Sequence, residues 1–272
     1  MLFSTFDSLL FRFFIIWYIC GVFLLTFDLL PPWLEWANVV FLLVAGILAM
    51  VYFVRSFHLT RGLFLIFFVF FLSMIMESIG VRTGLFFGDY TYESDFGPKL
   101  LGVPITIGFA WVMVIATSHT LASSITNKVT RMKGFVYALY ASFIATALDF
   151  IIDPVAFQVK QYWIWNEPGL YYGIPASNFY GWFILSFVIH YSFYLFMYKN
   201  GKWISERTDW DFRMKILYVL MTCMFLIIAI VNRLFLASFL SVLFLLTIYL
   251  TYYIADVRRT DFNDKSEKKH II

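Results

Sequence analysis

Three acidic residues stand out because they lie in or beside long apolar segments. Asp149 and Asp153 are four positions apart in one such segment, and Glu77 lies near the end of another. Residues four apart on a helix share a face, so the two aspartates are expected to lie side by side. Two neighbouring carboxylates repel each other when both are ionised, which favours one of them keeping its proton at neutral pH. The pattern therefore predicts a proton donor within or near a membrane, where charged groups tend to mark function.

A purely structural role is the alternative for these acids. They could form ion pairs with Arg82, Lys99 or Lys160, the basic residues predicted on the same side of the membrane. Asp153 also precedes Pro154, which places it at the expected end of its helix, where it could bind interfacial water. The residues alone leave both interpretations open.

Two loops near the acids, at 84–92 and 163–173, are rich in aromatic residues. Such rings could belong to the aromatic belt at the membrane surface. Because they are concentrated in two loops, we expect them to form the walls of a pocket, where aromatic faces can stabilise a cation. Asn178, near the start of the next apolar segment, could hold water or cap its helix. The predicted pocket residues are Tyr90, Tyr92, Trp111, Trp163, Trp165, Tyr171, Asn178 and Trp182.

The chain as a whole is too apolar for a water-soluble fold. It has 272 residues, of which 62% are hydrophobic and 14% charged, whereas a soluble domain carries about a quarter charged residues. A helix that crosses a bilayer needs about 20 mostly apolar residues. Segments of this kind lie near 13–30, 36–54, 62–80, 101–124, 134–152, 178–198, 214–231 and 234–254. The sequence therefore predicts an all-α, polytopic transmembrane bundle of about eight helices, although the last two segments meet without Gly or Pro and could form one bent helix.

The distribution of basic residues predicts the orientation of the chain. Four of the 20 Lys and Arg residues lie opposite both termini, namely Arg82, Lys99, Lys160 and Arg233. Since cytoplasmic loops are enriched in Lys and Arg, both termini of this multi-pass protein of the cell membrane are expected in the cytoplasm. Residues 1–256 would form a single transmembrane domain, followed by a polar, frayed cytoplasmic tail at 257–272. The net charge of +3 is too small to suggest a nucleic-acid partner.

Two stretches of the chain, 102–119 and 173–190, are similar to each other. Aligned without gaps, they share the pairs Gly102/Gly173, Pro104/Pro175, Trp111/Trp182 and His119/His190. The similarity predicts two copies of one helical hairpin in the same orientation, at about 62–124 and 134–198, with a site between them. Each histidine would lie about 22 Å along its helix from the proline, far from the acids. We therefore expect the histidines to form hydrogen bonds between helices rather than to act as catalysts.

Several classes of chemistry lack the residues that they require. Cys20 and Cys223 lie alone in apolar segments, no spacing of His, Cys and acids suggests a metal site, and no Gly-rich loop suggests a nucleotide. We therefore expect a reaction without a metal or another cofactor. A proton donor among aromatic walls suits protonation of an alkene, since the resulting carbocation can be captured by water or can lose a proton. The residues thus favour acid chemistry on an isoprenoid lipid.

A longer pattern extends over roughly residues 70–195. It consists of Glu77, Gly84, Phe87-Gly88, Tyr90, Tyr92, Leu101-Gly102-Val103-Pro104, Trp111, Asp149, Asp153-Pro154, Trp163, Trp165, Tyr171, Gly173-Ile174-Pro175, Asn178 and Gly181-Trp182. This pattern resembles the carotenoid biosynthesis membrane-protein family, whose characterised members are carotenoid 1,2-hydratases, including the bisanhydrobacterioruberin hydratases of archaea. The resemblance implies cofactor-independent addition of water across the terminal C1–C2 double bond of an acyclic carotenoid end, giving a tertiary alcohol. The partners it implies are a carotenoid within the bilayer, membrane lipid and other enzymes of the carotenoid pathway.

Under this hypothesis, Asp149 or Asp153 donates a proton to C2, while Glu77 and Asn178 orient and deprotonate the attacking water. The predicted pocket residues would surround the carotenoid end. A proton-coupled transporter of a lipid or small solute is one alternative, and it would need helices interrupted near the membrane midplane. An intramembrane cyclase or prenyltransferase is another. Known intramembrane prenyltransferases share the Asp-x-x-x-Asp spacing, but they hold Mg²⁺-diphosphate between two Asp-rich segments, and this chain has one.

Overall fold

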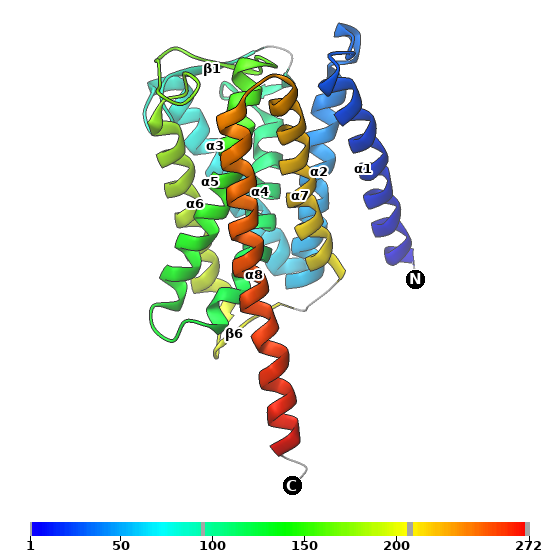
Figure 1. Ribbon diagram of the computed structural model, residues 1–272, viewed down its shortest axis with the longest axis vertical. Helices are drawn as coiled ribbons and strands as arrows, with labels where there is room; N and C mark the ends of the chain where they lie inside the picture. The colour runs from blue at the N-terminus through cyan, green and yellow to red at the C-terminus, as the bar shows by residue number, and fades with distance from the viewer. Residues whose placement is uncertain (1, 94–95, 206–208, 270–272) are drawn as a thin grey trace.

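The described part of the chain folds into a bundle of eight long helices. A computed structural model describes residues 2–93, 96–205 and 209–269, and Figure 1 shows their arrangement. The helices are α1 (Leu2–Thr26), α2 (Trp36–Phe57), α3 (Leu59–Thr83), α4 (Ile105–Ala122), α5 (Lys133–Gln158), α6 (Ala176–Met197), α7 (Asp209–Val231) and α8 (Phe235–Lys269). Each contains a stretch long and apolar enough to cross a membrane. The prediction of a multi-pass, helical membrane protein is therefore confirmed.

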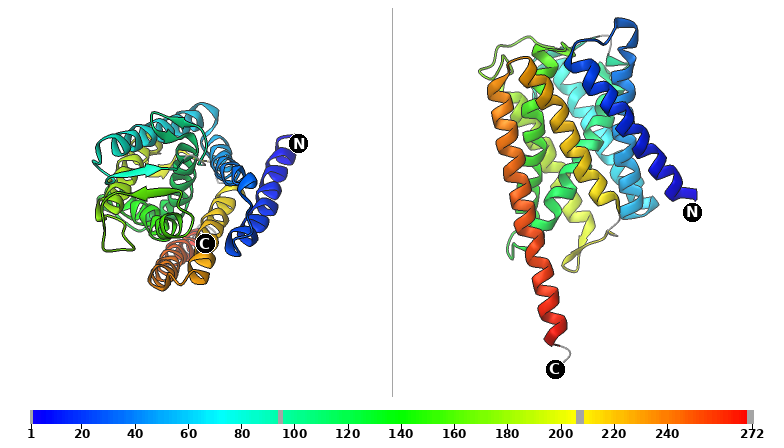
Figure 2. Two further views of the ribbon diagram at one scale, coloured as in Figure 1. Left: turned by 90° about the horizontal axis from the view of Figure 1, so that it is seen from above. Right: turned by 45° about the vertical axis from the view of Figure 1, so that its right-hand side comes forward.

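The helix α4 lies at the centre of the bundle and α1 at its edge. In the apolar stretch of α4, 83% of the residues are buried, against 17% in α1. The end-on view in Figure 2 shows α1 beside α2 and α7, on the opposite side of the bundle from α6. The core thus forms around α4, and α1 covers the bundle only from outside.

Two of the central helices begin directly after a proline. Pro104 precedes α4 and Pro175 precedes α6, each with an extended backbone. A proline is tolerated there because the first turn of a helix leaves its N–H groups without helical partners anyway. α3 ends at Gly84, which has a φ of 67° that glycine adopts without strain, and the Gly84 N–H donates to the Gly80 carbonyl at 2.8 Å.

The seventh and eighth helices are separate, and the alternative of one bent helix is wrong. The chain reverses at 232–234, where Arg233 has a left-handed φ of 61°. The Leu234 N–H closes this turn by donating to the Ala229 carbonyl at 2.8 Å. The helix α8 extends into the polar segment that follows the last apolar stretch and ends at Lys269. No Gly or Pro follows Phe235 in the sequence, so no helix-breaking residue ends α8 earlier.

Short antiparallel strand pairs fix the loops at the ends of the bundle. The pairs are β1 (Tyr90–Tyr92) with β4 (Trp163–Trp165), β2 (Lys99–Leu100) with β3 (Val103–Pro104), and β5 (Tyr198–Lys199) with β6 (Lys202–Trp203). The first pair joins the two aromatic loops, with Tyr90 opposite Trp165 and Tyr92 opposite Trp163. Both loops lie at the upper end of the bundle in Figure 1. The predicted pocket walls therefore come together although they are about 70 positions apart in the sequence.

The helix α5 continues through Pro154, so Asp153 lies inside a helix and its predicted place at a helix end is wrong. Pro154 has no N–H and cannot donate to the Phe150 carbonyl, four residues earlier. The hydroxyl of Tyr171 donates to that carbonyl instead, at 2.8 Å. A side chain from the second aromatic loop thus replaces the missing helical hydrogen bond, and α5 extends to Gln158.

Candidate active site

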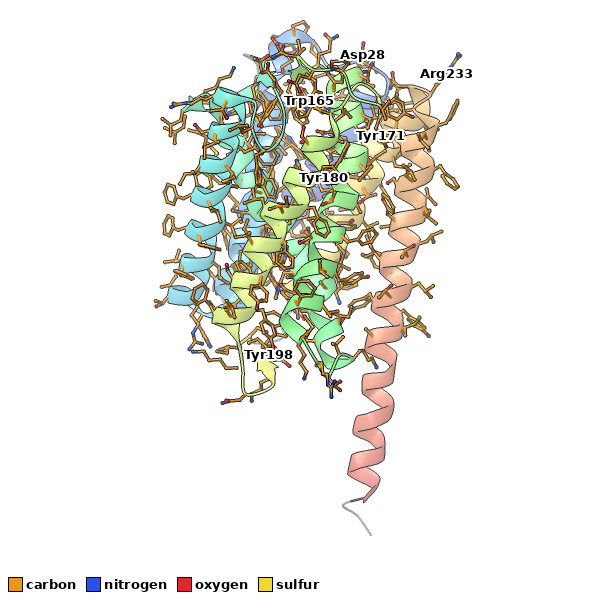
Figure 3. All side chains as sticks on the ribbon, turned by 90° about the vertical axis from the view of Figure 1, so that its left-hand side faces the viewer. Asp28, Trp165, Tyr171, Tyr180, Tyr198 and Arg233 are labelled. Atoms are coloured by element: carbon orange, nitrogen blue, oxygen red, sulfur yellow. The ribbon has the colours of Figure 1, made fainter. Side chains whose placement is uncertain are left out.

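Three acids and one amide meet at the end of the bundle that carries the aromatic loops. Glu77 comes from the last turns of α3, Asp149 and Asp153 from α5, and Asn178 from the first turn of α6. All four side chains are buried. Figure 3 labels Trp165 and Tyr171 at this end, opposite the end marked by Tyr198.

The carboxylate of Glu77 accepts hydrogen bonds from three neutral donors. The hydroxyls of Tyr90 and Tyr92 both donate to Oε2, the latter at 3.0 Å, and the Trp111 indole donates to Oε1 at 2.9 Å. Burial, together with the neighbouring Glu77, raises the pKa of both tyrosine hydroxyls well above the usual range, so they stay protonated donors. Glu77 is thus surrounded by the donors that an acceptor-only carboxylate needs.

The two aspartates share one donor group, and the Trp163 indole is a further donor to Asp153. Nδ2 of Asn178 donates to Oδ2 of Asp149 at 2.8 Å and also to Oδ2 of Asp153. Oδ1 of Asp149 is buried and has no hydrogen-bond partner. One shared amide and one indole are too little to stabilise two buried carboxylates when both are ionised. A proton held by the pair removes one of the two charges. The geometry confirms that both aspartates lie on one face of α5, and it makes them suited to hold a proton.

The ion-pair interpretation of the acids is wrong for the described residues. Lys160 donates to the Leu25 carbonyl at 2.9 Å and pairs with Asp28 at 3.4 Å. Lys99 donates to the Tyr92 carbonyl. Among the side chains that the structure describes, in residues 5–93, 96–205 and 209–255, no Lys or Arg lies within 4.0 Å of the three carboxylates. The acids are therefore held by neutral donors alone.

A cavity of about 100 Å³ lies directly beside Glu77, Asp153 and Asn178. Its walls include seven of the eight predicted pocket residues, which are Tyr90, Tyr92, Trp111, Trp163, Trp165, Asn178 and Trp182. The rings of Trp111 and Trp182 stack with centroids 4.3 Å apart. The indole Nε1 of Trp165 is buried and has no hydrogen-bond partner in this structure. The cavity thus combines Asp153 of the aspartate pair, the Glu77 carboxylate and aromatic walls.

Two predicted site residues do not line this cavity. Asp149 is fully buried and reaches it only through Asn178. Tyr171 is directed to the Phe150 carbonyl and packs against the Phe179 ring, 5.6 Å away between centroids. Because its hydroxyl donates to this carbonyl of α5, Tyr171 does not contribute to the cavity wall.

Other cavity residues were not predicted from the sequence. Asn38, Lys160 and Tyr162 form one side, and Met221 and Met224 of α7 belong to another. Asn38 is a polar residue at the start of an apolar helix, and the methionines are three positions apart on one helix face. The polar residue and the methionine spacing are visible in the sequence. Nothing in the sequence, however, places α7 beside the aromatic loops.

Glycines allow the first aromatic loop to pack closely against α6. A Cβ at Gly181 would lie 2.6 Å from the Phe87 ring and 2.8 Å from the Phe86 carbonyl. Gly88 has a φ of +108°, and a Cβ there would lie 2.9 Å from Pro175. A larger residue at either position would push the loop away from α6 and so move Tyr90 and Tyr92 away from Asn178.

The two histidines of the similar stretches lie between helices, as predicted. Nδ1 of His119 in α4 is 2.6 Å from the Tyr137 hydroxyl in α5. Nε2 of His190 in α6 is 3.0 Å from the Ser118 hydroxyl in α4. Neither histidine lines the cavity. They connect the central helices, which agrees with interhelical hydrogen bonding rather than catalysis.

Comparisons with known proteins connect the chain with carotenoid biosynthesis. The sequence profile of a family described as carotenoid biosynthesis protein matches residues 37–248. A bisanhydrobacterioruberin hydratase of Haloarcula japonica is 31% identical over 111 residues, which is 40% of this chain and 36% of that protein. The alignment thus spans about a third of the length of this curated relative. No solved structure matches the chain significantly.

Proposed function

The chain belongs to the carotenoid biosynthesis protein family, and from this premise we propose that it is a carotenoid hydratase. It would add water across the terminal C1–C2 double bond of an acyclic carotenoid end and give a tertiary alcohol. The observation that carries the proposal is the buried aspartate pair, which shares the Asn178 amide at the wall of an aromatic cavity. The hydratase from Haloarcula japonica supports the same reaction class.

Asp153 donates the proton in the first step. It lines the cavity, whereas Asp149 does not, so Asp153 is the member of the pair that can reach a substrate. The π electrons of the double bond form the new C2–H bond, and the positive charge remains on the tertiary carbon C1. Asn178 holds the Asp153 carboxylate in place while the carboxylate becomes charged.

Glu77 accepts a proton from the water that attacks C1. As the new C–O bond forms, one water proton passes to the Glu77 carboxylate, which leaves a neutral tertiary alcohol. Return of this proton to the aspartate pair restores the starting state. The cycle consumes one water and neither releases nor takes up a net proton, so no cofactor is needed.

The aromatic walls stabilise the cation between these two steps. The stacked Trp111 and Trp182 rings and the Tyr90 and Trp165 rings, 4.9 Å apart between centroids, all border the cavity. A desolvated cation over an aromatic face gains about 2 kcal/mol or more. The walls would therefore lower the barrier to protonation and keep bulk water away from the cation.

Only the terminal part of the carotenoid enters the cavity. The cavity volume of about 100 Å³ is well below the roughly 300–1,000 Å³ of sites that enclose a whole ligand. The polyene would lie between helices beside α7, where Met221 and Met224 form the wall. Methionine side chains adapt to irregular shapes and suit such an entrance.

Two finer sequence predictions belong to this proposal. The segments 62–124 and 134–198 would be related hairpins that enclose the site, which is supported by the equivalent places of Pro104 and Pro175 before α4 and α6. Both termini would lie in the cytoplasm, which is supported by the distribution of Lys and Arg. The acids would then lie near the outer face of the membrane.

The function is tested by expressing the chain in bacteria that make lycopene and analysing the pigments by mass spectrometry. The wild-type chain should give a product heavier by one water. Asp153→Asn and Glu77→Gln should each lower this product by about 100-fold or more, as expected for loss of a general acid or base. Glu167→Gln, which changes an exposed acid of the second aromatic loop, should leave the yield unchanged.

Two outcomes would contradict parts of the proposal. Hydrated product at the wild-type level from both amide variants would overturn the roles of Asp153 and Glu77. A folded wild-type chain that hydrates no acyclic carotenoid would overturn the hydratase assignment itself.

A further inference from the structure

A second pocket, of about 400 Å³, lies next to the acid-lined cavity. The two spaces share part of one wall, which is made by Leu25, Asn38, Phe96, Lys160 and Tyr162. The lining of the second pocket is strongly polar and includes the charged side chains of Asp28, Glu35, Glu93 and Lys160. A space with such a lining favours water, whereas the cavity beside it has mostly apolar walls.

The shared wall contains polar side chains. The Asn38 amide and the Tyr162 hydroxyl form a hydrogen bond with each other. Tyr162 is fixed at both sides of its backbone, since its N–H donates to the Ala156 carbonyl at 2.9 Å and its carbonyl accepts from Glu93 at 3.1 Å. Both polar groups can pass a water molecule by exchanging one hydrogen bond for another.

Another part of the cavity wall is apolar. Met221, Phe225 and Ile228 of α7 border it there with side chains that cannot hold water. The cavity therefore has apolar wall residues suited to a polyene as well as polar wall residues suited to water.

We propose that the polar pocket supplies the attacking water and that Asn38 and Tyr162 pass it to the acid-lined cavity. This inference rests on the proposed hydratase function. Hydration consumes one water in each cycle. Because the polyene would lie against the apolar wall residues, the water needs a different route into the cavity. The polar pocket has the wall contacts and the lining that such a supply requires.

The proposal predicts a specific change in the product when water is withheld. The cation at C1 then has no nucleophile and returns to an alkene by losing a proton. In D₂O, Asp153 delivers a deuteron to C2, and loss of a proton from C2 or from a methyl group on C1 leaves deuterium in the recovered alkene. Deuterium exchange thus reports protonation, and alcohol formation reports capture by water.

The experiment uses membranes that carry the full-length protein, with lycopene as the probe in D₂O buffer. Asn38→Leu removes one of the polar side chains of the shared wall, and Ile164→Trp fills the polar pocket from a partly exposed position in β4. Thr91→Trp is the matched control, because Thr91 is the strand partner of Ile164 but does not line the pocket. Asp153→Asn serves as the variant that cannot protonate the substrate, because it lacks the proposed proton donor.

Asn38→Leu and Ile164→Trp should each lower the hydrated product by at least about tenfold, while deuterium in the recovered lycopene stays at or above the wild-type level. Thr91→Trp should match the wild type in both measurements, and Asp153→Asn should lose both. Wild-type hydration by both test variants, or a parallel loss of hydration and exchange in both, would overturn the water route. A wild type with neither activity would instead overturn the hydratase function.

Discussion

The indole of Trp111 stacks on that of Trp182, with ring centroids 4.3 Å apart and an angle of 26° between the planes. Trp111 also donates a hydrogen bond to Glu77, whereas Trp182 makes no such bond within the described residues. The two stacked rings therefore differ in what they contribute to the acid cluster.

Replacing each tryptophan by phenylalanine separates these contributions. Trp111→Phe removes a donor from a carboxylate and should lower hydration by about 10- to 100-fold, in line with 1.5–3 kcal/mol for a hydrogen bond to a charged group. Trp182→Phe keeps an aromatic face in the wall and should lower hydration less than about tenfold. The rate of alcohol formation per folded protein is the measurement. Equal losses in both variants would contradict the donor role of Trp111.

The hydrogen bond from Tyr171 to the Phe150 carbonyl predicts a loss of stability in Tyr171→Phe. Without the hydroxyl, the carbonyl that Pro154 leaves unpaired has no described partner, and α5 should weaken beside Asp153. We expect the free energy of unfolding to fall by about 1 kcal/mol, a typical value for a side-chain hydrogen bond within a membrane protein. The melting temperature of purified protein in detergent measures the effect. Tyr180→Phe is the control, because Tyr180 is 69% exposed on the outside of α6, as Figure 3 shows; equal melting temperatures for the two variants would rule out this role.

Much of the fold could be predicted from the sequence because the bilayer imposes simple length and polarity rules. Each apolar segment became a helix, and the pairing of Asp149 with Asp153 followed from the helical repeat alone. The continuation of α5 through Pro154 could not be predicted in this way. The local rule for proline ends the helix there, but a hydroxyl from 17 positions further along supplies the missing hydrogen bond.

The candidate site could be predicted only where residue type and short-range spacing identify its members. The three acids and most of the aromatic walls were found from residue type and spacing. The bridge from Asn178 to both aspartates joins residues 29 and 25 positions apart, and it depends on how α5 packs against α6. The presence of Met221 and Met224 in the wall depends likewise on helix packing, which hydropathy does not encode.

The shared amide of Asn178 predicts a rescue experiment. Asn178→Leu should remove the donor of both aspartates, lower hydration by about 100-fold and lower the free energy of unfolding by about 1–3 kcal/mol, the cost of an unsatisfied buried polar group. In this background, Asp149→Leu should restore part of the stability, because only one buried carboxyl remains. It should not restore hydration. Thermal unfolding and product analysis of the two variants check both statements; if the second substitution destabilises further, the aspartates do not compete for this donor.

The distribution of basic residues predicts which ends of the bundle face the cytoplasm. Arg233 lies at the end that carries the aromatic loops, and Tyr198 lies at the opposite end (Figure 3). A cysteine placed by Arg233→Cys should therefore react with a membrane-impermeant maleimide on intact cells. Lys202→Cys, in the β5–β6 hairpin near Tyr198, should react only after the cells are opened. Cys20 and Cys223 should first be replaced by alanine so that labelling reports only the new thiol. The reverse labelling pattern would place the acid cluster at the cytoplasmic face, and the polar pocket would then draw its water from the cytoplasm.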